Sequence, residues 1–275
     1  MKYIKTSFLA IFIFSLSLLA SCSDSRITMY QVCNDYHEIC HDIDTEGWCK
    51  HQRSDLIIRR YQQLQTPRDL DNTYRTLMSW RKFNDCIAVA SKITRRTVED
   101  RTSVRTKAYL TSIKEIEKLE QQTLASTYPQ LMYYHWAEDG KQYRIDALIK
   151  LDQQGKMAST ELQLMMASYY AKVDKTKEMT AQYNALSLLD LASEYQLNNQ
   201  IYASLATNYY QKNKYHLAFI WARVAEKSGL KTAAVSTLKR KLKAEKYDLK
   251  HLEDIAHKTY LSIAANKFTP PEQLL

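Results

Sequence analysis

Apolar side chains recur along this chain at the spacing of an amphipathic helix. Between residues 109 and 119 they stand at intervals of four, three and three, at Tyr109, Ile113, Ile116 and Leu119, and charged residues fill the positions between them. An α-helix has 3.6 residues per turn, so these side chains share one face. The segments 128–138 and 143–153 show a similar pattern on either side of Gly140. We therefore predict two helices joined by a short turn there, and further pairs from about residue 67 onward.

The segment 199–231 resembles a tetratricopeptide repeat. Such a repeat needs small residues where its two helices cross, and Ala206 and Ala218 are twelve residues apart, as those positions require. Tyr202 and Tyr209 match the aromatic residues that fill the inner face of the hairpin. A looser copy begins at Thr160, about 39 residues earlier rather than 34. The resemblance implies a stacked, tetratricopeptide-like solenoid, and the alternative is an irregular helical bundle.

The first helix of each pair lines the concave surface in solenoids of this kind, and that surface commonly binds extended peptides. On the helix expected over 199–211, four residues would face this groove: Gln200, Thr207, Tyr210 and Gln211. They are our candidate peptide-binding residues. The alternative is that they are plain solvated positions.

The composition agrees with a helical fold. The 275 residues include 4 Gly and 4 Pro, where average usage gives roughly 19 and 14. A β-rich fold needs many tight turns made from these residues, so we predict an all-α fold of stacked hairpins with a disulfide-stapled N-terminal helical segment. The expected order is a signal peptide over 1–21, a cysteine-rich helical segment over 22–66, a helical body over 67–158, tetratricopeptide-like hairpins over 159–245, and a C-terminal helix and tail over 246–275. Residues 268–275, with Pro270-Pro271, are expected to form a frayed tail.

The N-terminus carries an export signal. Lys2 and Lys5 precede an apolar run over residues 8–20 that is too short for a permanent membrane span. The following Leu19-Ala20-Ser21-Cys22 resembles the lipobox of bacterial lipoproteins, which implies acylation of Cys22. Ser23 in the next position implies transfer to the outer membrane, on its periplasmic face. The alternative is an ordinary signal peptide that contains a cysteine.

Four cysteines remain after Cys22: Cys33, Cys40, Cys49 and Cys86. An even number of thiols in an oxidising compartment predicts two disulfides, with three connectivities open. One continuous helix over 29–40 would hold Cys33 and Cys40 about 10 Å apart, beyond the roughly 7 Å limit for a bridge. We therefore favour Cys40–Cys49 with Cys33–Cys86.

Two metal-site hypotheses compete with the disulfides. The same cysteines stand among His37, His41 and His51, which are soft ligands, although the spacing of Cys49 and His51 fits zinc poorly. Residues 42–47 match the opening of an EF-hand loop, but Arg53 stands where calcium needs a bidentate Glu. We expect no metal and no cofactor.

The cysteine-rich segment carries one further resemblance. Glu38-Ile39-Cys40, followed by Glu46-Gly47-Trp48-Cys49 behind a lipobox, is similar to an uncharacterised family of bacterial envelope lipoproteins. The resemblance implies an envelope location and no particular activity.

Charge and motifs bound the function. The net charge of +9 becomes +7 when Lys2 and Lys5 leave with the signal (9 − 2). Such a surface suits anionic lipids or acidic proteins, whereas a periplasmic address argues against nucleic acid. The chain lacks the H-E-x-x-H, G-x-S-x-G and P-loop patterns. We therefore expect a lipid-anchored interaction module that binds a periplasmic protein or peptide, the alternative being a cell-envelope enzyme, for example a peptidoglycan-related one, with an unrecognised site.

Overall fold

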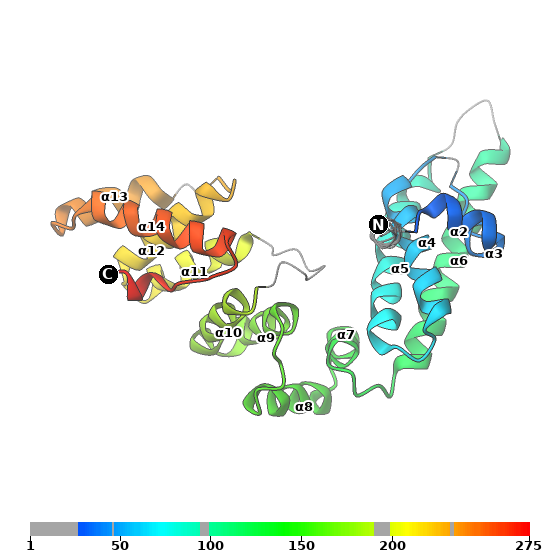
Figure 1. Cartoon of the computed structure of the whole chain (residues 1–275), viewed down its shortest axis with the longest axis horizontal. Coiled ribbons are helices and arrows are strands. Elements are labelled where there is room, and N and C mark those ends of the chain that lie inside the picture. The colour runs from blue at the N-terminus through cyan, green and yellow to red at the C-terminus, as the bar shows by residue number, and fades with distance from the viewer. Residues whose placement is uncertain (1–26, 46, 94–98, 190–198, 232–233) are drawn as a thin grey trace, which may run out of the picture. The chain divides into compact units, whose positions relative to one another are not determined.

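A computed structural model describes residues 27–45, 47–93, 99–189, 199–231 and 234–275. The signal peptide and Cys22 lie outside these residues. The described chain divides into two compact units, Met1–Thr123 and Leu124–Leu275, and the boundary falls inside the segment 67–158 that we expected to be one body. Within the described residues the regular elements are all helices, which confirms the all-α prediction (Figure 1).

In its described residues the first unit contains five helices, α2 (Met29–Asp35), α3 (His37–His41), α4 (Lys50–Gln65), α5 (Leu70–Ala90) and α6 (Glu99–Thr123). Helix α5 packs against both α4 and α6. Its apolar residues Leu77, Trp80, Phe83 and Ile87 recur every three or four positions and are all buried, as a helix covered along one stripe requires. Asp69 begins α5, because its carboxylate accepts the backbone N–H groups of Asp71 and Asn72.

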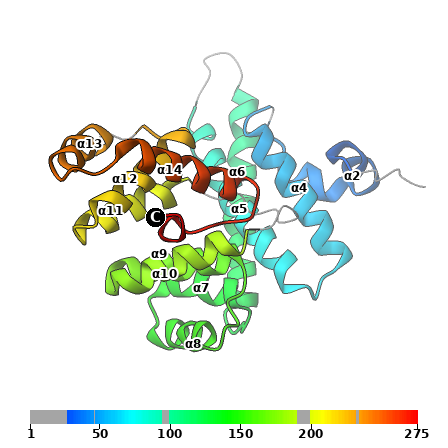
Figure 2. The same cartoon turned by 60° about the vertical axis from the view of Figure 1, so that its left-hand side comes forward.

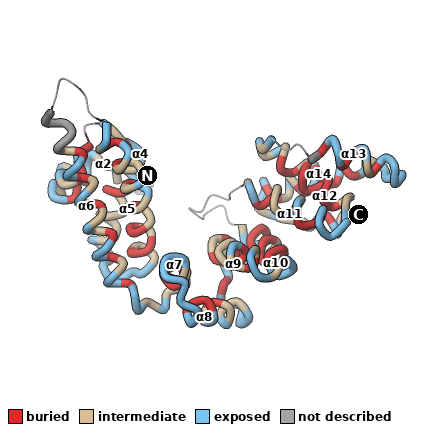
Figure 3. Tube along the Cα trace, turned by 180° about the vertical axis from the view of Figure 1, so that it is seen from behind, coloured by how far each residue is buried: buried red, intermediate tan, exposed pale blue. Residues whose placement is uncertain are grey.

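The second unit consists of helices in consecutive pairs, α7 (Pro129–Asp139) with α8 (Gln142–Gln153), α9 (Thr160–Val173) with α10 (Lys175–Ser187), α11 (Gln200–Gln211) with α12 (Tyr215–Lys227), and α13 (Ala234–Ala244) with α14 (Leu249–Ala264). Gly140 ends α7 in the left-handed conformation, at φ 66°. Helix α12 packs against α11, α13 and α14. Eight of its 13 residues are buried, and red segments gather in this part of the unit in Figure 3.

The disulfides join Cys33 to Cys40 and Cys49 to Cys86, so the pairing that we favoured is wrong. The expected helix over 29–40 is interrupted at Tyr36, whose φ of −132° and ψ of 68° separate α2 from α3. This break folds α3 back and brings the Cα atoms of Cys33 and Cys40 to 5.6 Å, which is within the range for a bridge. Cys49, directly before α4, is then left to pair with Cys86 of α5.

The segment proposed as a calcium loop is held by arginines of α4. Arg53, at the twelfth loop position, donates from Nε to the carbonyl of Ile43 at 2.9 Å and from Nη2 to that of Cys40 at 3.1 Å. Arg60 donates to both carboxylate oxygens of Asp42, from Nη1 at 2.7 Å and from Nη2 at 2.9 Å. The twelfth loop position, where calcium would need a carboxylate, thus holds a guanidinium that donates to backbone carbonyls. All four cysteines of the zinc hypothesis form disulfides, so they have no thiolate with which to bind zinc.

We expected residues 268–275 to form a frayed tail, but they are ordered. After α14 the chain returns across the second unit and ends in a short 3₁₀ turn, η2 (Pro271–Gln273), which contacts α12 and α14 (Figure 2). Pro271 is buried. The order comes from aromatic and hydroxyl partners on α10, α11 and α12, which the tail sequence alone does not show.

Candidate functional site

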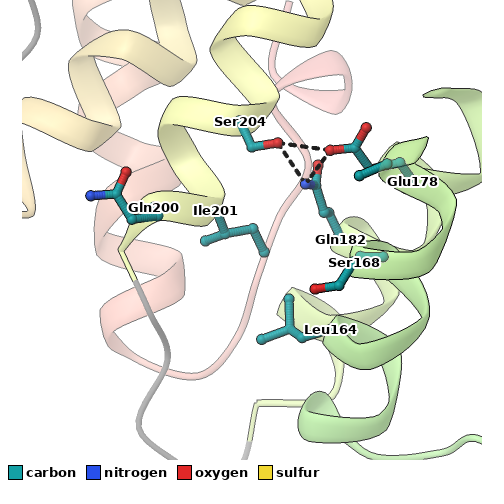
Figure 4. Close-up of a pocket in the computed structure, with 9 residues that line it drawn as sticks. Leu164, Ser168, Glu178, Gln182, Gln200, Ile201 and Ser204 are labelled. Carbon is teal, nitrogen blue, oxygen red and sulfur yellow. Dashed lines mark hydrogen bonds between the residues drawn. The ribbon is translucent and has the colours of Figure 1, made fainter. Parts of the chain in front are cut away.

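A polar cavity of about 280 Å³ lies where the α9–α10 hairpin faces α11 (Figure 4). Three helices supply its walls. Its polar lining comes from Ser168, Glu178, Gln182, Gln200 and Ser204, and its apolar lining includes Leu164 and Ile201. Ligand sites typically combine an apolar wall with a few convergent polar groups in this way.

Helical spacing explains why these side chains converge. Leu164 and Ser168 are four residues apart on α9, as are Glu178 and Gln182 on α10, so each pair lies on one face of its helix. Ser204 follows Gln200 by four residues on α11. The start of α10 is fixed by Asp174, whose carboxylate accepts the backbone N–H groups of Thr176 and Lys177.

A hydrogen-bonded triad closes one side of the cavity. Glu178 Oε1 accepts from Ser204 Oγ at 2.9 Å and from Gln182 Nε2 at 3.2 Å. Gln182 Nε2 also donates to Ser204 Oγ at 2.8 Å. Glu178 Oε2 accepts from the ammonium of Lys175 at 2.8 Å. The buried carboxylate of Glu178 therefore has donors on both oxygens, which its desolvation requires.

Gln182 has one polar atom without a partner. A carboxylate can only accept hydrogen bonds, so Gln182 must turn its amide nitrogen toward Glu178. Its carbonyl, Oε1, then has no hydrogen-bond partner among the described residues, and only 5% of the residue is exposed. Such an atom costs about 1–3 kcal/mol when it is left unsatisfied. A ligand that brought an N–H or O–H donor into the cavity would recover part of this free energy.

A larger hollow in the first unit, of about 460 Å³, is a poorer candidate. It is lined by Arg60, Trp80 and Lys118, among others. Arg60 is paired with Asp42, and Lys118 donates to Glu115 at 3.1 Å. None of the described residues that line it contains a buried polar atom without a hydrogen-bond partner.

The cavity includes one of the four groove residues that we predicted. Gln200 lines it, whereas the three others lie outside its lining. The hydroxyl of Thr207 donates to Ala203 of its own helix, and Tyr210 packs edge-on against Tyr215 with ring centroids 5.4 Å apart. Gln211 is exposed at the end of α11.

Sequence reasoning missed the triad of Glu178, Gln182 and Ser204. The interval of four residues between Glu178 and Gln182 was a visible sign that they share a helix face. It did not show that α11 covers this face, because that contact joins residues more than twenty positions apart.

Comparisons with known proteins identify a family and no function. No curated protein matches the chain, and no solved structure matches it. None of the helices in the described ranges combines the length and apolar character needed to cross a membrane. The model of one family, described as "Protein of unknown function (DUF2989)", matches residues 19–223. Since this match covers well over half of the sequence, the chain belongs to that family of unknown function.

Proposed function

We propose that this chain is a lipid-anchored protein-interaction module on the periplasmic face of the bacterial outer membrane. Acylated Cys22 would attach it to the membrane. A segment of a periplasmic protein or peptide partner would bind in the cavity between the α9–α10 hairpin and α11.

The cysteine chemistry supports the compartment. Disulfides persist in oxidising spaces such as the periplasm and are rare in the cytosol. Both bridges of this chain, Cys33–Cys40 and Cys49–Cys86, lie in its first unit. They follow the lipobox-like Leu19-Ala20-Ser21-Cys22, so one route of export would account for the acylated cysteine and for both disulfides.

The observation that carries the binding role is the unpaired carbonyl of Gln182 inside the cavity. A backbone N–H of an extended polypeptide is a donor of the kind that this carbonyl lacks. Leu164 and Ile201 could receive an apolar side chain beside it. A partner would therefore need an N–H group to donate to the Gln182 carbonyl and a small apolar side chain to pack against Leu164 and Ile201.

Binding fits this cavity better than catalysis does. A glycosidase-type mechanism needs two carboxylates, or a comparable acid–base pair, at a set distance. Glu178 is the one carboxylate among the described residues that line the cavity, and both of its oxygens already have donors.

Site-specific photo-crosslinking in intact cells tests the proposal. A photoreactive amino acid replaces Gln200, which lines the cavity, or Gln211, which is a glutamine at the other end of the same helix. We expect a discrete crosslinked protein from position 200 and little from position 211. Crosslinks from position 211 alone would move the interaction to the outer end of α11, and no crosslink from either position would contradict the interaction role.

A further inference from the structure

Helices α10 and α11 also border a second hollow, of about 330 Å³, which shares no lining residue with the cavity described above. Tyr183, Tyr209, Lys212 and Lys214 are among the residues that line it. We propose that this hollow binds an acidic polypeptide segment of a partner. The C-terminal tail, defined as Phe268–Leu275, is then a tethered ligand that occupies the same phenol contacts.

The tail places a carboxylate on the phenols of this hollow. The hydroxyl of Tyr183 lies 3.0 and 3.1 Å from the two carboxylate oxygens of Glu272, and the hydroxyl of Tyr209 donates to one of them. Tyr183 Oη in turn accepts the indole N–H of Trp221 at 3.1 Å. Each phenol can therefore give its single proton to the carboxylate, and hydrogen bonds to an ionised acceptor are about twice as strong as neutral ones.

An aromatic ring anchors the tail four residues before the carboxylate. Phe268 packs edge-on against Tyr183, with ring centroids 5.6 Å apart, and lies 6.2 Å from Trp221. Pro271 is buried between these two contacts in sequence. The tail thus indicates what this surface would recognise, which is an aromatic residue followed by two prolines and a carboxylate in a 3₁₀ turn. Proline restricts the chain before binding, so less conformational entropy is lost on docking.

The tail leaves the positive charge of the hollow unused. Lys212 donates to the hydroxyl of Thr176 at 3.2 Å. Lys212 also helps to lower the pKa of Asp174, but in the described part of the chain neither Lys212 nor Lys214 forms a salt bridge with a carboxylate. A partner segment that carries a second acidic residue would meet these two ammonium groups, which Glu272 does not reach. Charge complementarity therefore favours an acidic partner over the tail itself.

The tail also has the features of an exchangeable occupant. It forms a single 3₁₀ turn, and Glu272, Gln273 and Leu275 are exposed. Its removal from the phenols would break no helix. A partner with the same recognition elements could then take its place.

Peptide binding to the full chain in detergent tests this inference. One labelled peptide has the sequence of residues 267–275, and a second has Gln at the position of Glu272. Glu272→Gln in the protein weakens the tether, so we expect it to bind the acidic peptide about tenfold more tightly than the wild type does. The Gln peptide should bind about tenfold more weakly than the acidic one. A third peptide adds a second acidic residue to the tail sequence. Lys212→Glu with Lys214→Glu should reduce its binding, whereas Lys227→Glu, which reverses an exposed lysine on α12, should not.

Three outcomes would overturn the inference. The first is a Glu272→Gln protein that melts like the wild type and does not bind the acidic peptide. The second is equal binding of the acidic peptide and the Gln peptide, since the carboxylate would then be irrelevant. The third is a wild-type dimer that dissociates on Glu272→Gln substitution, because the occupant would then be the tail of a second copy. The residues involved differ from those of the proposed cavity, so failure here and failure of the Gln200 crosslink are distinguishable.

Discussion

The sulfur of Cys49, one residue before α4, is bonded to the sulfur of Cys86 in the last turns of α5. This bridge spans 37 residues, whereas the bridge between Cys33 and Cys40 spans 7. A disulfide restricts the unfolded chain, and the longer loop loses more entropy when it is closed.

Removal of the longer bridge should therefore cost more stability. We expect Cys49→Ala with Cys86→Ala to lower the free energy of unfolding by about 1.5 kcal/mol more than Cys33→Ala with Cys40→Ala does. Urea denaturation of the two double variants measures the difference. Equal losses would show that native packing, rather than loop length, sets the contribution of each bridge.

Ser204→Ala should destabilise the second unit. The substitution removes one donor from the buried carboxylate of Glu178 and the acceptor of Gln182 Nε2. We expect a loss of about 1–3 kcal/mol in the free energy of unfolding, because Glu178 Oε1 and Gln182 Nε2 each lose a hydrogen bond and keep the 3.2 Å bond to each other. Ser187→Ala is the matched control, since this exposed hydroxyl donates only to Tyr183 of its own helix. A Ser204→Ala protein as stable as the control would argue against the triad.

Several tyrosines should resist ionisation at alkaline pH. Burial, with a smaller contribution from Tyr260, raises the pKa of Tyr202 to about 12. Burial is likewise the largest cause that raises the pKa of Tyr183, and Tyr209 and Glu272 raise it further. Burial also raises the pKa of Tyr209, which Glu272 raises further and the hydrogen bond with Tyr183 lowers. Absorbance titration of phenolate should show these residues ionising after the rest, whereas in denaturant all 20 tyrosines should titrate near pH about 10.

Stability should decrease over the same pH range. A folded-state pKa above the unfolded value means that the folded protein retains protons that the unfolded chain releases. The stabilisation is complete below pH about 10 and is lost as pH rises from there toward the folded-state values. Urea denaturation at a series of pH values checks this, and a flat profile above pH about 10 would contradict the burial of the phenols.

Cys22→Ser should abolish membrane attachment and leave the fold intact. Without the thiol no acyl chain can be added, and two or more chains are needed for stable anchoring. We expect loss of radiolabelled palmitate and release of the protein from the membrane fraction. Its helical circular dichroism should match that of the wild type. Retained palmitate would place the lipid on another residue.

The sequence predicted the helices better than the contacts between them. The segments expected at 128–138 and 143–153 correspond to α7 (Pro129–Asp139) and α8 (Gln142–Gln153), because local periodicity and Gly140 define both. The break at Tyr36 depends on one residue with no turn-forming side chain, so the sequence did not reveal it, and the disulfide pairing went wrong with it.

The candidate sites were harder to predict for the same reason. Gln182 and Ser204 are 22 residues apart, and Tyr183 and Glu272 are 89 apart. Pro270-Pro271 suggested a disordered tail, because the sequence does not show the aromatic residues, distant along the chain, against which the tail packs. Contacts over such separations depend on how the hairpins stack, which no local pattern encodes.

If the chain is lipid-anchored as proposed, the early start of α2 limits how far its first unit could lie from the membrane. Helix α2 begins at Met29, and Thr28 caps it through a reciprocal pair of hydrogen bonds with Gln31. If Cys22 bears the lipid, seven residue steps separate the acylated residue from the start of α2 at Met29. Even a fully extended linker of that length spans only about 25 Å. The first unit, in which α2 lies, would therefore be held close to the bilayer surface.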